Sequence, residues 1–230
     1  MKVLAVTHGP NVGPGVFRDA IEEAGHELDE WSMLGGSAPP SVEGYGGMIV
    51  FGGAMHADQE EQHPWLREED AFLRGLLERR VPTLGVCLGA QLLVKAIGGP
   101  VFRAPTPEKG WMHVELTDAA DDDPVIGALP RRFLAFDWHE YTWRLPEHDG
   151  AVELARSERY PQAYRIGERA WGIQFHAEVN RPIVRSWLDD FESGYPDRDA
   201  VWREIDAHMD EWNELGRSLC TAFVAAASRM

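Results

Sequence analysis

The chain has 230 residues, of which 44% are hydrophobic and 26% charged, with a formal net charge of −16. This length and composition are typical of a soluble globular protein whose core fills one α/β domain or two small ones. The negative charge, together with a count of only three lysines, excludes nucleic-acid binding, which needs clustered lysine and arginine. No apolar run approaches the roughly 18 residues that cross a bilayer, and the N-terminal run is too short for a signal peptide. We therefore expect a cytoplasmic protein that does not associate with membranes.

The first half of the chain alternates apolar strands with helices. Its strands are continuous apolar runs, and two of its helices end at glycines. Strand–helix alternation with such strands predicts a parallel sheet covered on both faces. A Gly/Pro-rich turn over residues 8–15 follows the first strand. The expected elements are strand Lys2–Thr7, helix Val16–Ala24, strand Gly47–Phe51, helix Trp65–Arg80, strand Val81–Cys87 and helix Leu88–Ile97.

The second half predicts short strands followed by a long helix. The strands are expected at Trp111–Leu116, Phe133–Phe136, Val152–Ala155, Gln162–Ile166 and Trp171–Phe175. Residues 121–124 predict a loop and a helix start. The tail, Arg198–Ser228, carries apolar residues at spacings of three and four, so it is expected to be a helix that either docks a partner subunit or folds back on its own domain. No linker or repeat divides the chain, which predicts one domain over residues 1–230, with a core of about 1–195 and a helical extension of about 197–228.

Cys87 lies in a Gly-x-Cys-x-Gly turn between a predicted strand and a predicted helix. Gly85 and Gly89 permit a sharp turn that projects the cysteine from the carboxyl edge of the sheet, as in a nucleophile elbow. The start of the following helix favours a thiolate and offers backbone N–H groups to a developing oxyanion. Cys220, inside the predicted tail helix, is expected to be a buried apolar residue, and no disulfide joins the two cysteines.

His176 and Glu178 end the strand predicted at residues 171–175. Residues two apart in an extended segment point to the same face, so the carboxylate of Glu178 can orient the imidazole of His176. With Cys87 they supply a nucleophile, a base and a group that orients the base. Taken alone, the His-x-Glu pair also fits a polar surface at the end of a strand.

Four stretches of the sequence resemble the class I glutamine amidotransferase family, whose members carry a Cys-His-Glu triad on a flavodoxin-like core. They are Phe51–Ala54, Gly85–Gln91, Gly172–Glu178 and, more loosely, Asp137–Trp143. The resemblance implies an α/β fold, a three-layer sandwich with a mostly parallel central sheet, extra short antiparallel strands and a C-terminal helical tail.

The resemblance also implies residue roles. Cys87 would attack the side-chain amide of glutamine to give a γ-glutamyl thioester and ammonia, with His176 as base and then acid and Glu178 orienting it. The backbone N–H groups of Gly53 and Leu88 would form the oxyanion hole. Gln91 and a turn over residues 138–141 would bind the glutamyl group, giving as substrate-binding residues Gln91, Trp138, His139, Glu140 and Tyr141. No cofactor and no metal is implied.

Two positions depart from the family pattern. Ala177 stands where many relatives have proline, which is a mild change. His139–Trp143 stands where stand-alone relatives tend to read His-Gly-Asp-Thr-Phe, and this change adds a side chain and removes an acceptor beside the pocket. It leaves open which γ-glutamyl compound is the substrate.

Three other constellations carry less weight. Residues 56–63 hold two histidines and three acidic residues, but they share no helical face, so a solvated loop is expected rather than a metal site. Residues 121–123 lack the spacing of a calcium loop, and residues 9–15 lack the Lys-Ser/Thr of a phosphate-binding loop.

These features predict a cysteine amidohydrolase that acts on glutamine or on a related γ-glutamyl bond and releases ammonia or an amine. No synthetase domain is expected on this chain, so the ammonia goes either to a separate synthetase subunit or to solvent, as in free-standing γ-glutamyl peptidases. The sequence leaves open whether the chain forms a homodimer. One alternative is a non-catalytic regulatory or binding module that retains the fold. Another is a redox or stress protein of the related fold, which Glu178 disfavours.

Overall fold

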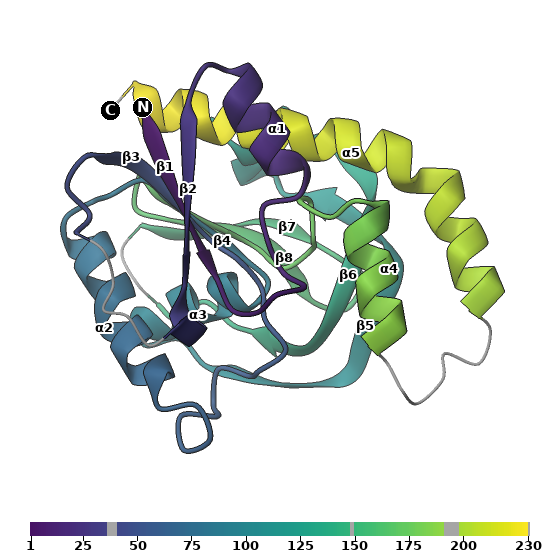
Figure 1. Ribbon diagram of the computed structural model, residues 1–230, viewed down its shortest axis with the longest axis horizontal. Coiled ribbons are helices and arrows are strands. Elements are labelled where there is room, and N and C mark those ends of the chain that lie inside the picture. Colours follow the sequence, from purple (N-terminus) through teal and green to yellow (C-terminus); the bar gives the residue numbers. More distant parts are fainter. Residues whose placement is uncertain (36–40, 148–149, 191–197, 230) are drawn as a thin grey trace.

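The computed structural model describes residues 1–35, 41–147, 150–190 and 198–229. A nine-stranded mixed sheet, with strand order β2-β1-β3-β4-β9-β8-β7-β5-β6, forms the middle layer. In Figure 1, helices α1 and α5 lie along one side of this sheet and α2 and α3 along the other. Each side has its own buried hydrophobic cluster, so the α/β sandwich expected from the sequence is confirmed.

One half of the sheet is parallel. Four of its strands are buried apolar runs close to the predicted ranges, and the fifth, β2, was not predicted. Strand β2 lies at the sheet edge and is polar and largely solvent-facing, so it has no apolar run to reveal it. These strands are β2 (Glu27–Ser32), β1 (Lys2–Thr7), β3 (Tyr45–Val50), β4 (Thr83–Val86) and β9 (Ala170–Ile173).

The other half is antiparallel, and two of its strands are much longer than predicted. Strand β6 runs straight through residues 138–141, so the turn expected there is wrong. The strand continues because residues 137–139 and 141–143 both pair with β5, with a shift of register between the two stretches. Polar residues interrupted the apolar pattern on which the shorter prediction rested. These strands are β8 (Pro161–Ile166), β7 (Ala151–Arg156), β5 (Val101–Leu116) and β6 (Arg132–Trp143).

Four helices match the prediction: α1 (Val16–Glu23), α2 (Trp65–Glu78), α3 (Leu88–Ala96) and α5 (Arg198–Ser228). Helix α5 packs on α1 and on the chain's own sheet and buries its apolar stripe, including Trp212 and Phe223. Of the two arrangements left open for the tail, folding back is therefore the one observed.

Helix α4 (Arg181–Asp190) was not predicted. Its start carries a recognisable signal, because the side chain of Asn180 accepts the N–H of Ile183 at 3.2 Å and Pro182 occupies the first turn. Instead of the helix expected after residue 124, the chain makes two short 3-10 turns, η2 (Asp118–Ala120) and η3 (Ile126–Ala128). A third such turn, η1 (Met33–Gly35), follows β2.

None of the helices in the described parts of the chain has the length and apolar character needed to span a lipid bilayer.

Candidate active site

The candidate site is a cavity of about 740 Å³ where the carboxyl ends of the parallel strands meet. Parallel α/β sheets place their ligand sites at this edge. Loops after β1, β3, β4 and β9 and the end of β6 contribute to its wall. Its lining includes nine of the ten residues predicted for the site: Gly53, Cys87, Leu88, Gln91, Trp138, His139, Glu140, Tyr141 and His176.

Cys87 has the backbone geometry of a nucleophile elbow. Its φ is +51°, a left-handed conformation that non-glycine residues rarely adopt, and it sits between β4 and α3. A Cβ on Gly85 would lie 2.7 Å from the backbone N of Ala90, and one on Gly89 would lie 2.0 Å from the carbonyl oxygen of Val50. The two glycines therefore let the turn pack tightly against its neighbours. Neither Cys87 nor Cys220 forms a disulfide bond.

His176 and Glu178 form a buried pair beside Cys87. The Nδ1 of His176 donates to Oε1 of Glu178 at 2.8 Å, and each side chain is only 4% exposed. A Cβ on Gly52 would lie 3.1 Å from Cε1 of His176 and 4.0 Å from Sγ of Cys87, so both side chains approach the same point. Burial lowers the pKa of His176, but the charges of Glu178 and Cys87 and the hydrogen bonds to them raise it well above its ordinary value. The arrangement favours a protonated imidazole that is hydrogen-bonded to Glu178 and lies beside Cys87.

The backbone around His176 is fixed by three other elements. The N–H of His176 donates to the carbonyl of Phe136 in β6 at 2.8 Å, and its own carbonyl accepts Nε1–H of Trp212 in α5 at 2.8 Å. The carbonyl of Glu178 accepts the N–H of Val16, the first residue of α1, at 2.9 Å. The long C-terminal helix thus supports the candidate base directly.

Gly53 and Leu88 lie next to each other at the predicted oxyanion hole. A Cβ on Gly53 would lie 3.0 Å from Cδ2 of Leu88. Leu88 is the first residue of α3, where a backbone N–H has no acceptor inside the helix. The positive end of the helix dipole also lies there, so this corner suits a developing negative charge.

His8, which sequence reasoning did not single out, holds the loop that carries Gly53. Its Nδ1 lies 3.1 Å from the carbonyl oxygen of Phe51 and 3.0 Å from that of Gly52, and its Nε2 lies 2.8 Å from Oε1 of Glu69. All these partners accept hydrogen bonds, so both ring nitrogens carry protons. Burial lowers the pKa of His8, but the charge of Glu69 and these hydrogen bonds raise it above its ordinary value.

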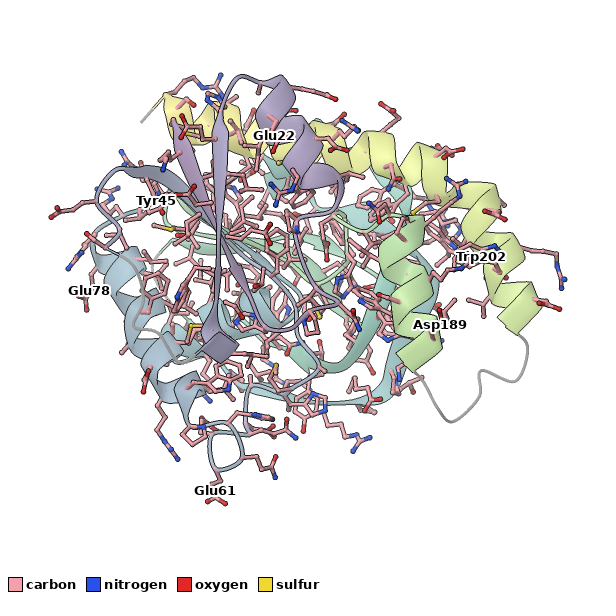
Figure 2. The ribbon with its side chains drawn as sticks, in the orientation of Figure 1. Glu22, Tyr45, Glu61, Glu78, Asp189 and Trp202 are labelled. Atoms are coloured by element: carbon pink, nitrogen blue, oxygen red, sulfur yellow. The ribbon has the colours of Figure 1, made fainter. Side chains whose placement is uncertain are left out.

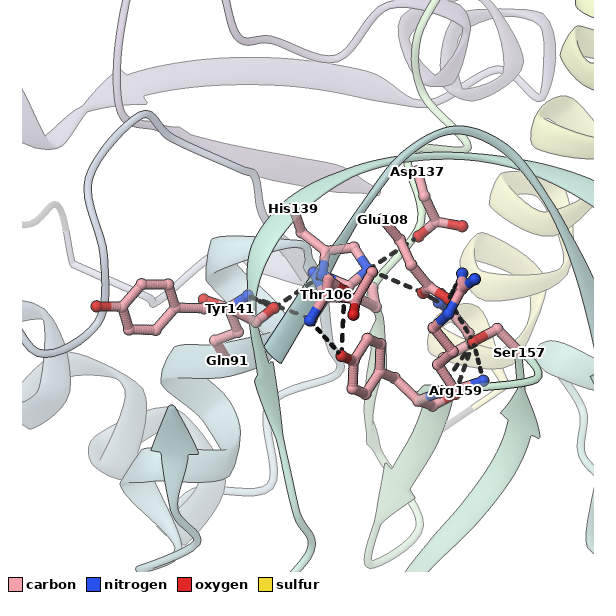
Figure 3. Close-up of polar contacts among 11 residues, drawn as sticks. Gln91, Thr106, Glu108, Asp137, His139, Tyr141, Ser157 and Arg159 are labelled. Atoms are coloured by element: carbon pink, nitrogen blue, oxygen red, sulfur yellow. Dashed lines mark hydrogen bonds and ion pairs between the residues drawn. The ribbon is translucent and has the colours of Figure 1, made fainter. Parts of the chain in front are cut away.

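The residues predicted to bind the glutamyl group converge on one carbonyl. The Nε2 of Gln91 donates to the carbonyl of Tyr141 at 3.1 Å, and Nδ1 of His139 donates to the same oxygen at 2.9 Å (Figure 3). The carboxylate of Glu140 accepts hydrogen bonds from Lys109 at 2.9 Å and from Arg103 at 3.2 Å. Gln91 is thereby oriented one turn into α3, beside Cys87.

Glu108, Asp137 and His139 form a buried cluster that the sequence did not reveal, and Figure 3 shows these side chains converging. Their ligand atoms lie within 4.8 Å of one another, and within the described ranges this is the one group of three with metal-binding spacing. The Nε2 of His139 lies 3.3 Å from Oε2 of Glu108 and 3.4 Å from Oδ1 of Asp137. Although burial lowers the pKa of His139, the two carboxylates raise it to about 10, so a protonated imidazole itself supplies the positive charge between them.

The cluster is also anchored from outside. Glu108 accepts hydrogen bonds from Oγ of Ser157 and from Nε2 of Gln162, each at 2.9 Å, and lies 3.8 Å from the guanidinium of Arg159. The imidazolium of His139 and the guanidinium of Arg159 therefore face the carboxylates of Glu108 and Asp137. This buried network positions His139, and through His139 the carbonyl of Tyr141.

The acidic, histidine-containing loop at residues 56–63 forms no metal-spaced group among the described residues. Figure 2 shows it projecting from the body, with Glu61 at its tip. The ring of His56 stacks on Tyr141 at 4.1 Å between centroids, and Glu60 pairs with Lys95. The loop thus borders the cavity.

Trp187 is a further lining residue that the sequence prediction missed. It lies on α4, and its ring meets the ring of His176 edge-on, with 4.8 Å between centroids. The apolar spacing of Ile183, Val184, Trp187 and Leu188, following Asn180, is the sequence signal that could have revealed the helix.

Comparison with known families gives one match over most of the chain. The sequence profile described as Glutamine amidotransferase class-I matches residues 28–190. The glutamine amidotransferase-like protein YfeJ of Salmonella typhimurium is 29% identical over 221 residues, which cover 93% of this chain and 91% of YfeJ. A subunit of the glutamine-hydrolysing GMP synthase of Ignicoccus hospitalis is 30% identical over 78% of this chain and 89% of that subunit.

Solved structures show the same likeness. A glutamine amidotransferase from Thermotoga maritima superposes with a TM-score of 0.87 at 30% identity, covering 97% of this chain and 98% of that one. A glutamine amidotransferase from Methylobacillus flagellatus gives a TM-score of 0.86 at 26% identity, covering 98% and 94%. By contrast, the match to the GMP synthase of Aeropyrum pernix spans only 25% of that longer protein.

Proposed function

Because the chain belongs to the class I glutamine amidotransferase family, we propose that it hydrolyses the side-chain amide of glutamine or a related γ-glutamyl bond through a thioester on Cys87. The observation that carries this proposal is the buried pair of His176 and Glu178 beside a cysteine in an elbow conformation. A nucleophile, a base and an orienting carboxylate in this relation are the parts that acyl transfer requires.

The proposed reaction has two halves. The thiolate of Cys87 attacks the amide carbonyl, and the negative charge on the carbonyl oxygen is received by the N–H groups of Gly53 and Leu88. The C–N bond then breaks, His176 gives its proton to the departing nitrogen, and a γ-glutamyl thioester remains. In the second half, water attacks the thioester while His176 takes a proton from it. The C–S bond then breaks, which releases glutamate and restores the thiolate of Cys87 and the protonated His176.

The supporting residues have separate tasks in this proposal. Glu178 keeps the imidazole of His176 in one orientation and stabilises its positive charge. Gln91, together with the backbone of residues 138–141 in β6, binds the glutamyl group. His8 holds the two carbonyls that precede Gly53, and so presents the N–H of Gly53 to the oxyanion.

The fate of the nitrogen is a separate proposal. The similarity to a subunit of a glutamine-hydrolysing GMP synthase suggests delivery of ammonia to a separate synthetase subunit. YfeJ, whose similarity covers nearly the whole of both chains, is named a glutamine amidotransferase-like protein, and this name mentions no synthetase. We favour free-standing hydrolysis, in which the amine or ammonia leaves to solvent.

Ammonia release from L-glutamine by the purified chain tests the function, combined with mass spectrometry after treatment with 6-diazo-5-oxonorleucine. We expect release of ammonia and a single adduct on Cys87, both lost in Cys87→Ala and both kept in the matched variant Cys220→Ala. An adduct without turnover points to a partner or to another γ-glutamyl substrate. Neither adduct nor turnover on any γ-glutamyl compound would favour the non-catalytic binding module.

A further inference from the structure

The position of His176 fixes where the leaving amine must lie. In the proposed reaction, on which this inference rests, the imidazole of His176 protonates the nitrogen that departs from the tetrahedral intermediate. That nitrogen, and any group attached to it, therefore faces the wall of the cavity beside His176. The chemistry of this wall decides which amine the enzyme accepts.

Two tryptophans form this wall. The ring of Trp187 lies 4.8 Å from that of His176 between centroids, and the rings of Trp138 and Trp187 are 6.1 Å apart with an interplanar angle of 52°. The Nε1–H of Trp187 donates to the carbonyl of Asn11 at 2.6 Å, which ties the indole to the loop after β1. We call Trp138 and Trp187 the tryptophan wall.

The surroundings of the tryptophan wall suit an uncharged group. The charges on the described residues lining the cavity are balanced by partners. Lys109 pairs with Glu140 at 2.9 Å, and the lining histidines at positions 8, 139 and 176 each pair with a buried carboxylate. Leu34, which is 47% exposed, also lines the cavity and adds apolar surface to it.

The cavity is also larger than glutamine needs. Its 740 Å³ falls within the range of about 300–1,000 Å³ that is typical of sites for drug-sized ligands. Ammonia, the amine released from glutamine, is too small to cover the indole surfaces that line the cavity. An aromatic ring on the amine would pack against these surfaces, in the edge or offset geometry that such rings prefer.

We propose that the tryptophan wall is a binding site for the leaving amine, and that the substrate is a γ-glutamyl amide whose amine carries an uncharged aromatic ring. Aromatic contacts on this side add binding energy beyond that of the glutamyl group. Substitutions in the wall therefore change discrimination between amines more than they change acyl transfer itself.

The experiment compares γ-L-glutamylbenzylamide with γ-L-glutamylmethylamide, by kcat/KM in the wild type and in Trp138→Ala and Trp187→Ala. We expect the wild type to prefer the benzylamide by at least about tenfold, and each variant to lower this ratio at least about fivefold. An effect of Trp187 on His176 changes kcat/KM for both amides equally, so it does not alter the ratio of the two kcat/KM values. The different intrinsic reactivity of the two amides is the same in every variant, so it does not alter the change in this ratio from wild type to variant. Trp202→Ala removes a tryptophan that lies outside the cavity, against Arg185, and should leave the ratio unchanged.

Equilibrium binding to Cys87→Ala keeps this inference separate from the proposed function. We expect this variant to bind the benzylamide at least about tenfold more tightly than the methylamide in calorimetry, whether or not the wild type turns either compound over. Equal binding of the two amides, or a ratio of kcat/KM that the two tryptophan variants do not change, would overturn the tryptophan-wall site while leaving γ-glutamyl hydrolysis intact. Absence of turnover with selective binding would overturn the reaction instead.

Discussion

Glu178→Gln removes the negative charge of the proposed orienting residue but keeps the shape of its side chain. The Oε1 of Glu178 accepts Nδ1–H of His176 at 2.8 Å, and a glutamine oxygen can accept the same hydrogen bond from the same place. The other carboxylate oxygen, Oε2, has no hydrogen-bond partner among the described residues, so an amide group there breaks no existing bond. What the substitution removes is the negative charge that stabilises the imidazolium of His176.

The size of the effect follows from that difference. A hydrogen bond to a charged group contributes about 1.5–3 kcal/mol, and a neutral one about 0.5–1.5 kcal/mol. Replacing the carboxylate by an amide should therefore cost about 1–2 kcal/mol of imidazolium stabilisation, which corresponds to a decrease of about 5- to 30-fold in kcat/KM. Because the raised pKa of His176 depends partly on the charge of Glu178, that pKa should fall in the variant.

Two readouts test this reasoning. The rate of γ-glutamyl hydrolysis and the rate of Cys87 alkylation by iodoacetamide at pH 7 should fall by similar factors, since both need the thiolate that the imidazolium stabilises. Cys220 does not interfere, because it is buried and burial raises the pKa of its thiol far above the assay pH. Glu153→Gln, a matched change in β7 outside the cavity, should leave both rates unchanged. If Glu178→Gln keeps both rates within twofold of the wild type, the charge of this residue has no role in activating the thiol.

Three further predictions concern the support of the site. Gly15→Ala should destabilise the fold by about 2–5 kcal/mol, because a Cβ at this position, where φ is +47°, would lie 1.9 Å from the carbonyl oxygen of Glu178. Gly25→Ala is the control, because its φ is +76° but the space around a Cβ there is open; it should cost only about 1–2 kcal/mol of unfolding free energy in urea denaturation. Equal losses of unfolding free energy in Gly15→Ala and Gly25→Ala would contradict the steric argument. Trp212→Phe should cost about 2–4 kcal/mol in urea unfolding, because it leaves the buried carbonyl of His176 without its 2.8 Å donor; an unchanged unfolding midpoint would refute this. The pKa of His139 is raised to about 10 in the folded state, so protonation of His139 stabilises the fold fully below about pH 6.5, and this stabilisation is lost as the pH rises towards 10. His139→Gln should remove up to about 1.4 kcal/mol per pH unit from the pH dependence of the unfolding free energy between these values. An unaltered pH dependence would show that His139 is not protonated.

The elbow and the alternating first half could be read from the sequence because they depend on local features. Gly85 and Gly89 mark a turn that only small residues can make, and apolar runs bounded by glycine specify strands and helices without reference to the rest of the chain. The long tail helix was predicted for the same reason, since its stripe repeats at helical spacing. The edge strand β2 and the helix α4 were missed because the first has no apolar run and the signals of the second are brief.

The tertiary structure alone decided which polar residues become part of the site. Strand β6 continues through residues 137–141 because β5 pairs with it, and this pairing places Asp137 and His139 beside Glu108. His8 meets Glu69 across a separation of 61 residues, and Trp187 contacts His176 from α4, which packs against α5.

The sequence thus determined the family and the turn that carries Cys87, because both depend on short segments whose residue types favour one backbone conformation. It could not determine the walls of the cavity or the charges buried behind them. A charged or aromatic side chain is stable inside a protein only with complementary partners, and those partners lie on strands and helices whose neighbours are set by the packing of the whole sheet.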